Sequence, residues 1–229
     1  MTGRVGREIR FASDGDEVGG YLVVPSGGLG PAVLVIQEWW GLVPHIEQIA
    51  DRFAAEGFVA LAPDLYHGQK TTSPDQAGKL MMSLRIDEAA RDLAAAAAYL
   101  GTLPEVTGAK VGTVGFCMGG ALSLFAASRN PDVGACVVFY GGHPNVKPDL
   151  AALQAPVLGL YAGLDTFVTP AVVDELDRQL TALGKRHEFH TYPQSQHAFF
   201  NDQRPEVHDA AASKDAWTRT VAFFRRELK

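Results

Sequence analysis

The chain has 229 residues, a length that single α/β domains commonly occupy and that allows a sizeable hydrophobic core. Its 20 basic and 26 acidic side chains give a net charge of −6 without a long run of like charges, which argues against nucleic acid and anionic membranes as partners. An apolar fraction of 47% is ordinary for a globular protein and excludes a disordered or fibrous chain.

The start of the chain, residues 1–8, is polar, and no later stretch approaches the roughly 18 consecutive apolar residues of a membrane span. We therefore expect a cytoplasmic protein. The two cysteines, Cys117 and Cys136, are too few for a disulfide framework, and a metal site would need other ligands. We expect no metal and no organic cofactor.

Short apolar runs alternate with longer helical patterns, which is typical of βαβ units around a mostly parallel sheet. Several runs are apolar at consecutive positions, as expected for strands that helices cover on both faces. The expected strands are residues 20–24, 32–38, 58–63, 111–116, 135–140, 156–161 and 188–192.

Helices are expected between these strands, and no linker or internal repeat divides the chain. The sequence therefore predicts a single domain over residues 1–229. The polar segment 67–84 has no regular pattern, and we interpret it as a flap over the site. The expected helices are residues 44–56, 86–100, 118–128, 170–183 and a last helix that ends in residues 217–228.

The strongest local signal is Gly115-x-Cys117-x-Gly119, between an apolar β-run and an apolar helix. This is the pattern of a nucleophile elbow with sulfur in place of the serine hydroxyl. A sharp strand-to-helix turn needs neighbours without side chains. The positive end of the helix favours a thiolate, and the Met118 N–H is the natural first donor of an oxyanion hole.

A cysteine between a strand and a helix can also be a small buried apolar residue. The flanking glycines, with a further Gly120, favour the nucleophile for Cys117. Cys136 has no such neighbours and lies in an apolar run, so we expect it in the core.

A thiol nucleophile needs a base, and the base needs an orienting carboxylate. Asp165 follows the expected strand 156–161, and His197 follows the expected strand 188–192, in the order nucleophile, acid, histidine. The alternative for Asp165 is a turn or helix cap before Pro170. The remaining histidines lie in strands or in less suitable loops, so His197 is the expected base.

Over essentially its whole length the chain resembles the dienelactone hydrolases, or carboxymethylenebutenolidases. Five sequence motifs carry the resemblance, and their combination in this order along the chain is specific for the family. They are Gln37-Glu38-Trp39-Trp40-Gly41-Leu42, Ala62-Pro63-Asp64-Leu65-Tyr66, Gly115-Phe116-Cys117-Met118-Gly119-Gly120, Gly163-Leu164-Asp165 and His197-Ala198-Phe199-Phe200-Asn201.

The resemblance implies an α/β-hydrolase fold: a mostly parallel central sheet with helices on both faces. It also implies that Glu38 contacts the resting thiol and helps to form the thiolate, and that the Trp39 N–H is the second oxyanion donor. In dienelactone-cleaving members two arginines grip the substrate carboxylate. Here Asn201 stands four residues after the histidine, so Arg204 and Arg85 are the candidates for substrate binding.

We therefore expect a carboxylic ester hydrolase that cleaves an ester or a dienelactone-like enol-lactone through Cys117, His197 and Asp165, with a thioester intermediate. The expected partner is a small-molecule substrate, and the protein is expected as a monomer or small homo-oligomer. The alternatives are a carboxylesterase, thioesterase or peptidase on the same scaffold, or a non-catalytic protein that senses redox state through Cys117.

Overall fold

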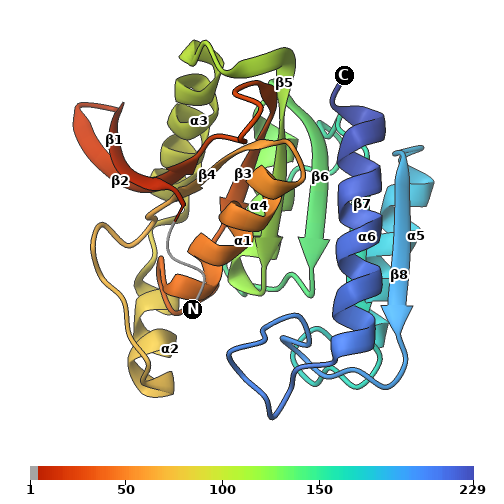
Figure 1. The fold of residues 1–229 in the computed structure, drawn as a ribbon. Helices are drawn as coiled ribbons and strands as arrows, with labels where there is room; N and C mark the ends of the chain where they lie inside the picture. The colour runs from red at the N-terminus through yellow and green to blue at the C-terminus, as the bar shows by residue number, and fades with distance from the viewer. Residues whose placement is uncertain (1–4) are drawn as a thin grey trace.

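Residues 5–229 are described by the computed structural model, so residues 1–4 of the polar start lie outside the described part of the chain. A single eight-stranded sheet runs through the described residues in the order β1-β2-β4-β3-β5-β6-β7-β8 (Figure 1). The strands are β1 (Arg7–Ser13), β2 (Asp16–Val23), β3 (Gly30–Ile36), β4 (Val59–Pro63), β5 (Val106–Phe116), β6 (Val133–Phe139), β7 (Val157–Ala162) and β8 (His187–Tyr192).

The first two strands form an antiparallel hairpin, and β2 pairs antiparallel with β4. From β4 to β8 every pairing is parallel. The fold class expected from the sequence, a mostly parallel sheet of the α/β-hydrolase type, is therefore confirmed. The helices are α1 (Pro44–Ala55), α2 (Pro74–Ser83), α3 (Ile86–Thr102), α4 (Met118–Arg129), α5 (Pro170–Ala182) and α6 (Ala210–Glu227).

Two elements differ from the expectation. Residues 7–13, which were not expected as a strand, form the edge strand β1, whose Phe11 is buried while charged neighbours point outward, as is common at sheet edges. The segment 67–84 is not irregular throughout, because it contains α2. This helix starts with Pro74 and an acidic Asp75, and Ala77 is the one residue in it that is fully buried.

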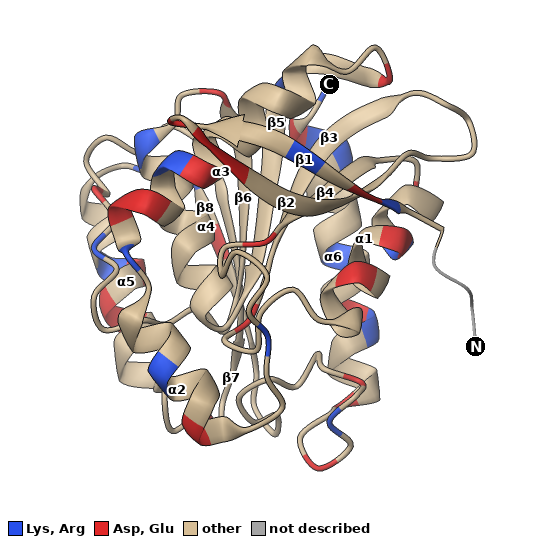
Figure 2. Ribbon diagram, turned by 90° about the vertical axis from the view of Figure 1, so that its left-hand side faces the viewer, with Lys and Arg blue, Asp and Glu red and all other residues tan. Residues whose placement is uncertain are grey.

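Helices cover both faces of the sheet (Figures 1 and 2). On one face α1 and α6 enclose a core that includes Phe53 and Phe224. On the other face α3, α4 and α5 enclose a second core that includes Leu100 and Leu124. Because both faces are covered, the central strands are buried at nearly every position, which explains their consecutive apolar residues.

Acidic and basic residues are interspersed over the outer helices (Figure 2). Within residues 5–229, every helix is too short or too polar to cross a lipid bilayer.

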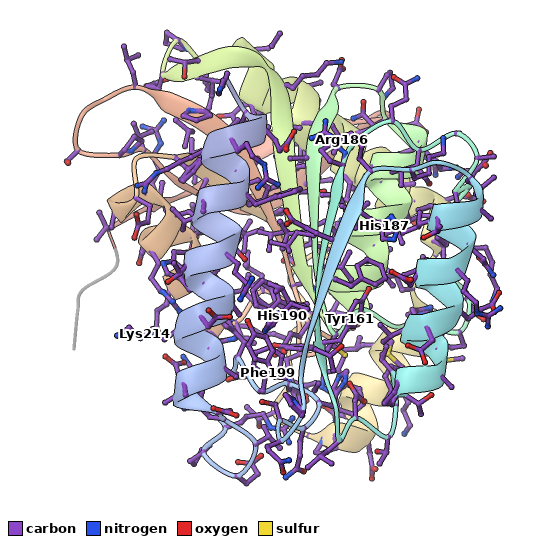
Figure 3. All side chains as sticks on the ribbon, turned by 90° about the vertical axis from the view of Figure 1, so that its right-hand side faces the viewer. Tyr161, Arg186, His187, His190, Phe199 and Lys214 are labelled. Atoms are coloured by element: carbon purple, nitrogen blue, oxygen red, sulfur yellow. The ribbon has the colours of Figure 1, made fainter. Side chains whose placement is uncertain are left out.

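The parallel strands end at one common edge, and this edge positions the site. Glu38 and Trp39 follow β3, Cys117 follows β5, and Asp165 follows β7. At the neighbouring edge strand, β8 ends at Tyr192, whose ring lies 5.0 Å from that of Phe199, so the loop after β8 folds back against the sheet (Figure 3). Ligand sites of open α/β sheets are found at this edge.

Candidate active site

Cys117 occupies a sharp turn between β5 and α4, with φ +54° and ψ −118°. A β-carbon at Gly115 would come within 1.9 Å of the Gly119 carbonyl oxygen, and one at Gly119 would come within 2.4 Å of the Gln37 carbonyl oxygen. Both positions therefore require glycine. The elbow expected from the sequence is present because only residues without side chains let the strand and the helix approach so closely.

The backbone holds the cysteine in this strained conformation. Its N–H donates to the Phe139 carbonyl at 3.1 Å, and its own carbonyl accepts from Gly120 and Gly142 at 3.0 and 3.2 Å. The side chain is 8% exposed. Since α4 begins at the next residue, Met118, the sulfur lies at the positive end of a helix dipole.

His197 and Asp165 form a short hydrogen bond, with 2.7 Å between Nδ1 and Oδ2. The Asp165 side chain is fully buried, and its other oxygen, Oδ1, accepts from the N–H groups of Phe167 and Val168 at 2.7 and 2.8 Å. These two bonds fix the carboxylate. Because the carboxylate accepts the Nδ1 proton, the imidazole presents Nε2 to the other side.

Burial of the imidazole lowers its pKa, but the hydrogen bonds to Asp165 and to Cys117 outweigh this effect and raise the pKa of His197 from 6.5 to about 10. The protonated imidazole is therefore the favoured form at neutral pH. Such a cation beside a sulfur atom stabilises a thiolate.

Glu38 is buried, with 1% of its surface exposed. Its Oε2 accepts from the Asn201 amide at 2.8 Å, while Oε1 has no hydrogen-bond partner among residues 5–229. The neighbouring Tyr140 hydroxyl is also buried. Burial, and then the nearby Glu38 and Cys117, hold the pKa of Tyr140 well above its usual value, so the phenol remains neutral.

An inner cavity of about 230 Å³ joins these groups. Larger cavities occur elsewhere on the described part of the molecule, and neither Cys117 nor His197 lines those cavities. Aromatic and apolar side chains form most of its wall, and Arg204 is the basic residue in it. Its lining residues are Glu38, Trp39, Trp40, Met81, Cys117, Phe167, His197, Ala198 and Arg204.

The two expected oxyanion donors come from two segments at the carboxyl edge of the sheet. The Met118 N–H is the first amide of α4, and the Trp39 N–H belongs to the loop after β3. No backbone carbonyl of residues 5–229 accepts from either group. Both amides are therefore available to a substrate oxygen.

The two candidate arginines lie at different cavities. Arg204 lines the inner cavity, with its guanidinium 6.0 Å from the Trp40 ring and its Nε 2.8 Å from Glu206. Arg85 has a side chain 76% exposed, pairs with Glu88 and lines a different cavity. Arg85 is thus not brought together with the nucleophile.

Sequence reasoning did not find Met81 or Phe167, which both line the inner cavity. Met81 belongs to α2, which was not expected as a helix. Phe167 lies two residues after Asp165, and its ring is 5.5 Å from the ring of His197. The sequence signal that could have identified Phe167 is its position in the same loop as Asp165.

An elbow at the end of a central strand, with an Asp–His pair from two later loops, defines the class of the α/β-hydrolases. The model of the dienelactone hydrolase family matches residues 18–228. The chain belongs to the dienelactone hydrolase family, which is a family of hydrolases.

Individual proteins support this assignment. The chain is 38% identical to protein usf of Aquifex pyrophilus, with 98% of this chain and 100% of that protein covered. It is 35% identical, with the same coverage, to a protein of Aquifex aeolicus provisionally named carboxymethylenebutenolidase. Among solved structures, a dienelactone hydrolase-like promiscuous phosphotriesterase from metagenomic libraries matches with a TM-score of 0.88 at 25% identity, over 98% of each chain.

Proposed function

We propose that this protein, acting as one α/β-hydrolase domain, hydrolyses a small carboxylic ester or enol-lactone with Cys117 as the nucleophile. The observation that carries the proposal is the position of His197, which bonds the buried Asp165 at 2.7 Å and shares the inner cavity with Cys117. A nucleophile, a base and an orienting carboxylate in this arrangement support acyl transfer.

In the proposed first half-reaction the Cys117 thiolate attacks the carbonyl carbon, and the carbonyl oxygen becomes an oxyanion held by the Met118 and Trp39 N–H groups. Collapse of this intermediate breaks the C–O bond of the ester. The leaving alkoxide takes a proton from the His197 imidazolium, and a thioester to Cys117 remains.

In the second half-reaction the neutral imidazole of His197 removes a proton from water, and the resulting hydroxide attacks the thioester. The C–S bond breaks, the carboxylic acid leaves, and the thiolate and imidazolium are restored. The raised pKa of His197 supports the imidazolium in this restored state.

For Glu38 we propose the role of a second base beside the thiol, which removes its proton whenever the cysteine is protonated. Its burial, its unpaired Oε1 and its place in the wall of the same cavity as Cys117 support this role. For Arg204 we propose contact with the substrate, whereas the exposed Arg85 is left out of the proposal.

The test compares two cysteine variants on aryl esters and enol-lactones. Cys117→Ala is expected to lower kcat/KM by roughly a thousandfold or more. Cys136→Ala is the matched control, because this second buried cysteine lies in the core away from the cavity. Hydrolysis by Cys117→Ala at the parent rate would contradict the proposal.

A substrate panel separates the rival activities. Preference for acyl thioesters, simple alkyl esters or peptides would indicate a thioesterase, a carboxylesterase or a peptidase on the same scaffold. Iodoacetamide labelling of Cys117 without turnover of any acyl compound would indicate a redox-sensing protein instead.

A further inference from the structure

A second, larger cavity adjoins the inner one. This outer cavity has a volume of about 590 Å³ and shares Trp40 and Arg204 with the inner cavity. Three segments form it: the loop before α2, the start of α1 and the loop after His197. Its lining residues are Trp40, Val43, Pro44, His45, Thr71, Thr72, Pro74, Asn201, Gln203, Arg204 and Glu206.

Contacts of Trp40, Arg204 and Asn201 form the wall between the two cavities. The Arg204 guanidinium lies over the Trp40 ring, and the Trp40 carbonyl accepts from the Thr71 N–H at 3.0 Å. Asn201 lines the outer cavity while its amide donates to Glu38 in the inner one. The two cavities therefore share a boundary that Trp40 and Arg204 form.

The inner cavity is too small for a substrate with more than a short acyl or alcohol group, so a larger substrate also needs the space of the outer cavity. Sites for small organic ligands span roughly 300–1,000 Å³, and the inner cavity alone has only about 230 Å³.

The chemistry of the outer cavity favours a neutral, hydroxylated ligand over an anion. Arg204 is already paired with Glu206 at 2.8 Å, and the Glu206 carboxylate would repel an anion beside it. Thr72 is exposed, and within residues 5–229 no group bonds its hydroxyl. The wall of the outer cavity has both an apolar part, formed by Trp40, Val43, Pro44 and Pro74, and a polar part of amide, hydroxyl and paired charged groups. A hydroxyl-bearing arm matches both parts, because its hydroxyl groups donate and accept while its C–H faces pack on the apolar side chains.

We propose that the outer cavity binds a neutral, hydroxyl-bearing arm of the substrate while the ester or lactone bond lies at Cys117. The proposal rests on the proposed ester hydrolysis and assigns its substrate class: an ester or lactone with a glycerol-like or sugar-like arm.

The first experiment measures kcat/KM of the parent protein by pH-stat on two matched series. One series varies the alcohol: propyl acetate, monoacetylglycerol and acetoxypropanoate. The other varies the acid: methyl esters of butanoate, dihydroxybutanoate and succinate. In at least one series we expect kcat/KM for the hydroxylated ester to be about tenfold higher than kcat/KM for the alkyl ester and for the carboxylated ester.

The second experiment fills the outer cavity with Thr72→Trp. The ratio of kcat/KM between the preferred hydroxylated ester and methyl acetate is expected to fall by about tenfold, mainly through KM. The matched control is Thr181→Trp, the same change at an exposed position on α5 that lines neither cavity. It is expected to leave both rates unchanged.

The outcomes separate the two proposals. If the parent cleaves methyl acetate but prefers the alkyl or carboxylated ester in both series, the outer-cavity proposal is wrong and the proposed hydrolysis stands. An unchanged ratio in Thr72→Trp would likewise overturn the outer-cavity proposal alone. If the parent cleaves no ester or lactone, the proposed function fails, and the outer-cavity proposal fails with it.

Discussion

Three of the five non-glycine residues with positive φ among residues 5–229 lie around the inner cavity. Cys117, Tyr140 and Ala198 all have positive φ, at +54°, +38° and +65°, and all three are buried. Such conformations cost on the order of 1–3 kcal/mol each in residues other than glycine and persist only where the surroundings enforce them. In this protein these strained positions are the proposed nucleophile, the residue after the proposed base and a tyrosine whose ring lies 5.1 Å from the His197 ring.

The Asp165 carboxylate is expected to control the protonation of His197. Asp165→Asn removes the negative partner that helps to raise the pKa of His197 to about 10, so this pKa should fall, and the imidazolium should be lost at lower pH than in the parent. An NMR titration of the His197 ring measures this shift. The loss of orientation should also lower kcat/KM by roughly a thousandfold.

A second aspartate–histidine pair provides the control. Asp177 bonds His187 at 3.0 Å, on α5 and β8 and outside the inner cavity. Asp177→Asn should leave hydrolysis and the His197 titration unchanged. If Asp165→Asn has no more effect than Asp177→Asn, the assigned role of Asp165 is wrong.

At the scale of elements, the elbow depends on glycine. Gly115→Ala would place a methyl group 1.9 Å from a backbone oxygen, which cannot move aside as a flexible side chain would. We expect the free energy of unfolding to fall by about 3 kcal/mol, as measured by urea denaturation, together with loss of activity. Gly101→Ala, at an open position of α3, should be neutral or stabilising, because alanine is the better helix former. Equal effects of both changes would contradict the steric role of Gly115.

Helix α2 forms one wall of the inner cavity and is held by a histidine. The His143 Nδ1 accepts from the Asn145 N–H at 3.0 Å, so Nε2 carries the proton and donates to the Met81 carbonyl at 3.1 Å. His143→Ala should therefore speed amide hydrogen exchange in α2 by roughly tenfold, which mass spectrometry detects. His187→Ala should leave exchange in α2 unchanged, and slow exchange in both variants would show that the bond does not hold the helix.

The elements that the sequence predicted share a strong pattern, and the missed ones lack it. Strands such as β3 and β7 are buried at nearly every position, and α3 carries a long run of alanines. Residues 7–13 form an edge strand that buries only Phe11 and Ser13, and α2 buries only Ala77, so neither element has the continuous buried run that made the central strands recognisable.

The site residues also divide into those whose positions the sequence pattern predicts and those whose positions it does not. Cys117, Asp165 and His197 follow strands, and the topology brings strand ends together, so their proximity was predictable. The position of Arg85, paired with Glu88 at the surface and away from the inner cavity, could not be predicted, because the side-chain direction at a helix start depends on packing that the sequence does not reveal.

At the scale of the whole molecule, α6 seals one face of the sheet. Phe224 is fully buried, with its ring 5.9 Å from Phe53 and 6.1 Å from Phe58. Phe224→Ala should lower the free energy of unfolding by about 3–5 kcal/mol, measured by urea denaturation. The exposed Val172 on α5 is the control, since Val172→Ala should change stability by less than about 0.5 kcal/mol. A small effect of Phe224→Ala would mean that α6 contributes little to the core.

The covalent intermediate offers the most direct test of the proposed chemistry. The protein is mixed with excess aryl ester, quenched in acid within the first turnovers and digested, and the peptides are analysed by mass spectrometry. We predict the mass of the acyl group on the peptide that contains Cys117, and no acyl group on this peptide in Cys117→Ala. Rapid turnover with the acyl group on another residue, or with Cys117 never acylated, would contradict the assignment of Cys117 as the nucleophile.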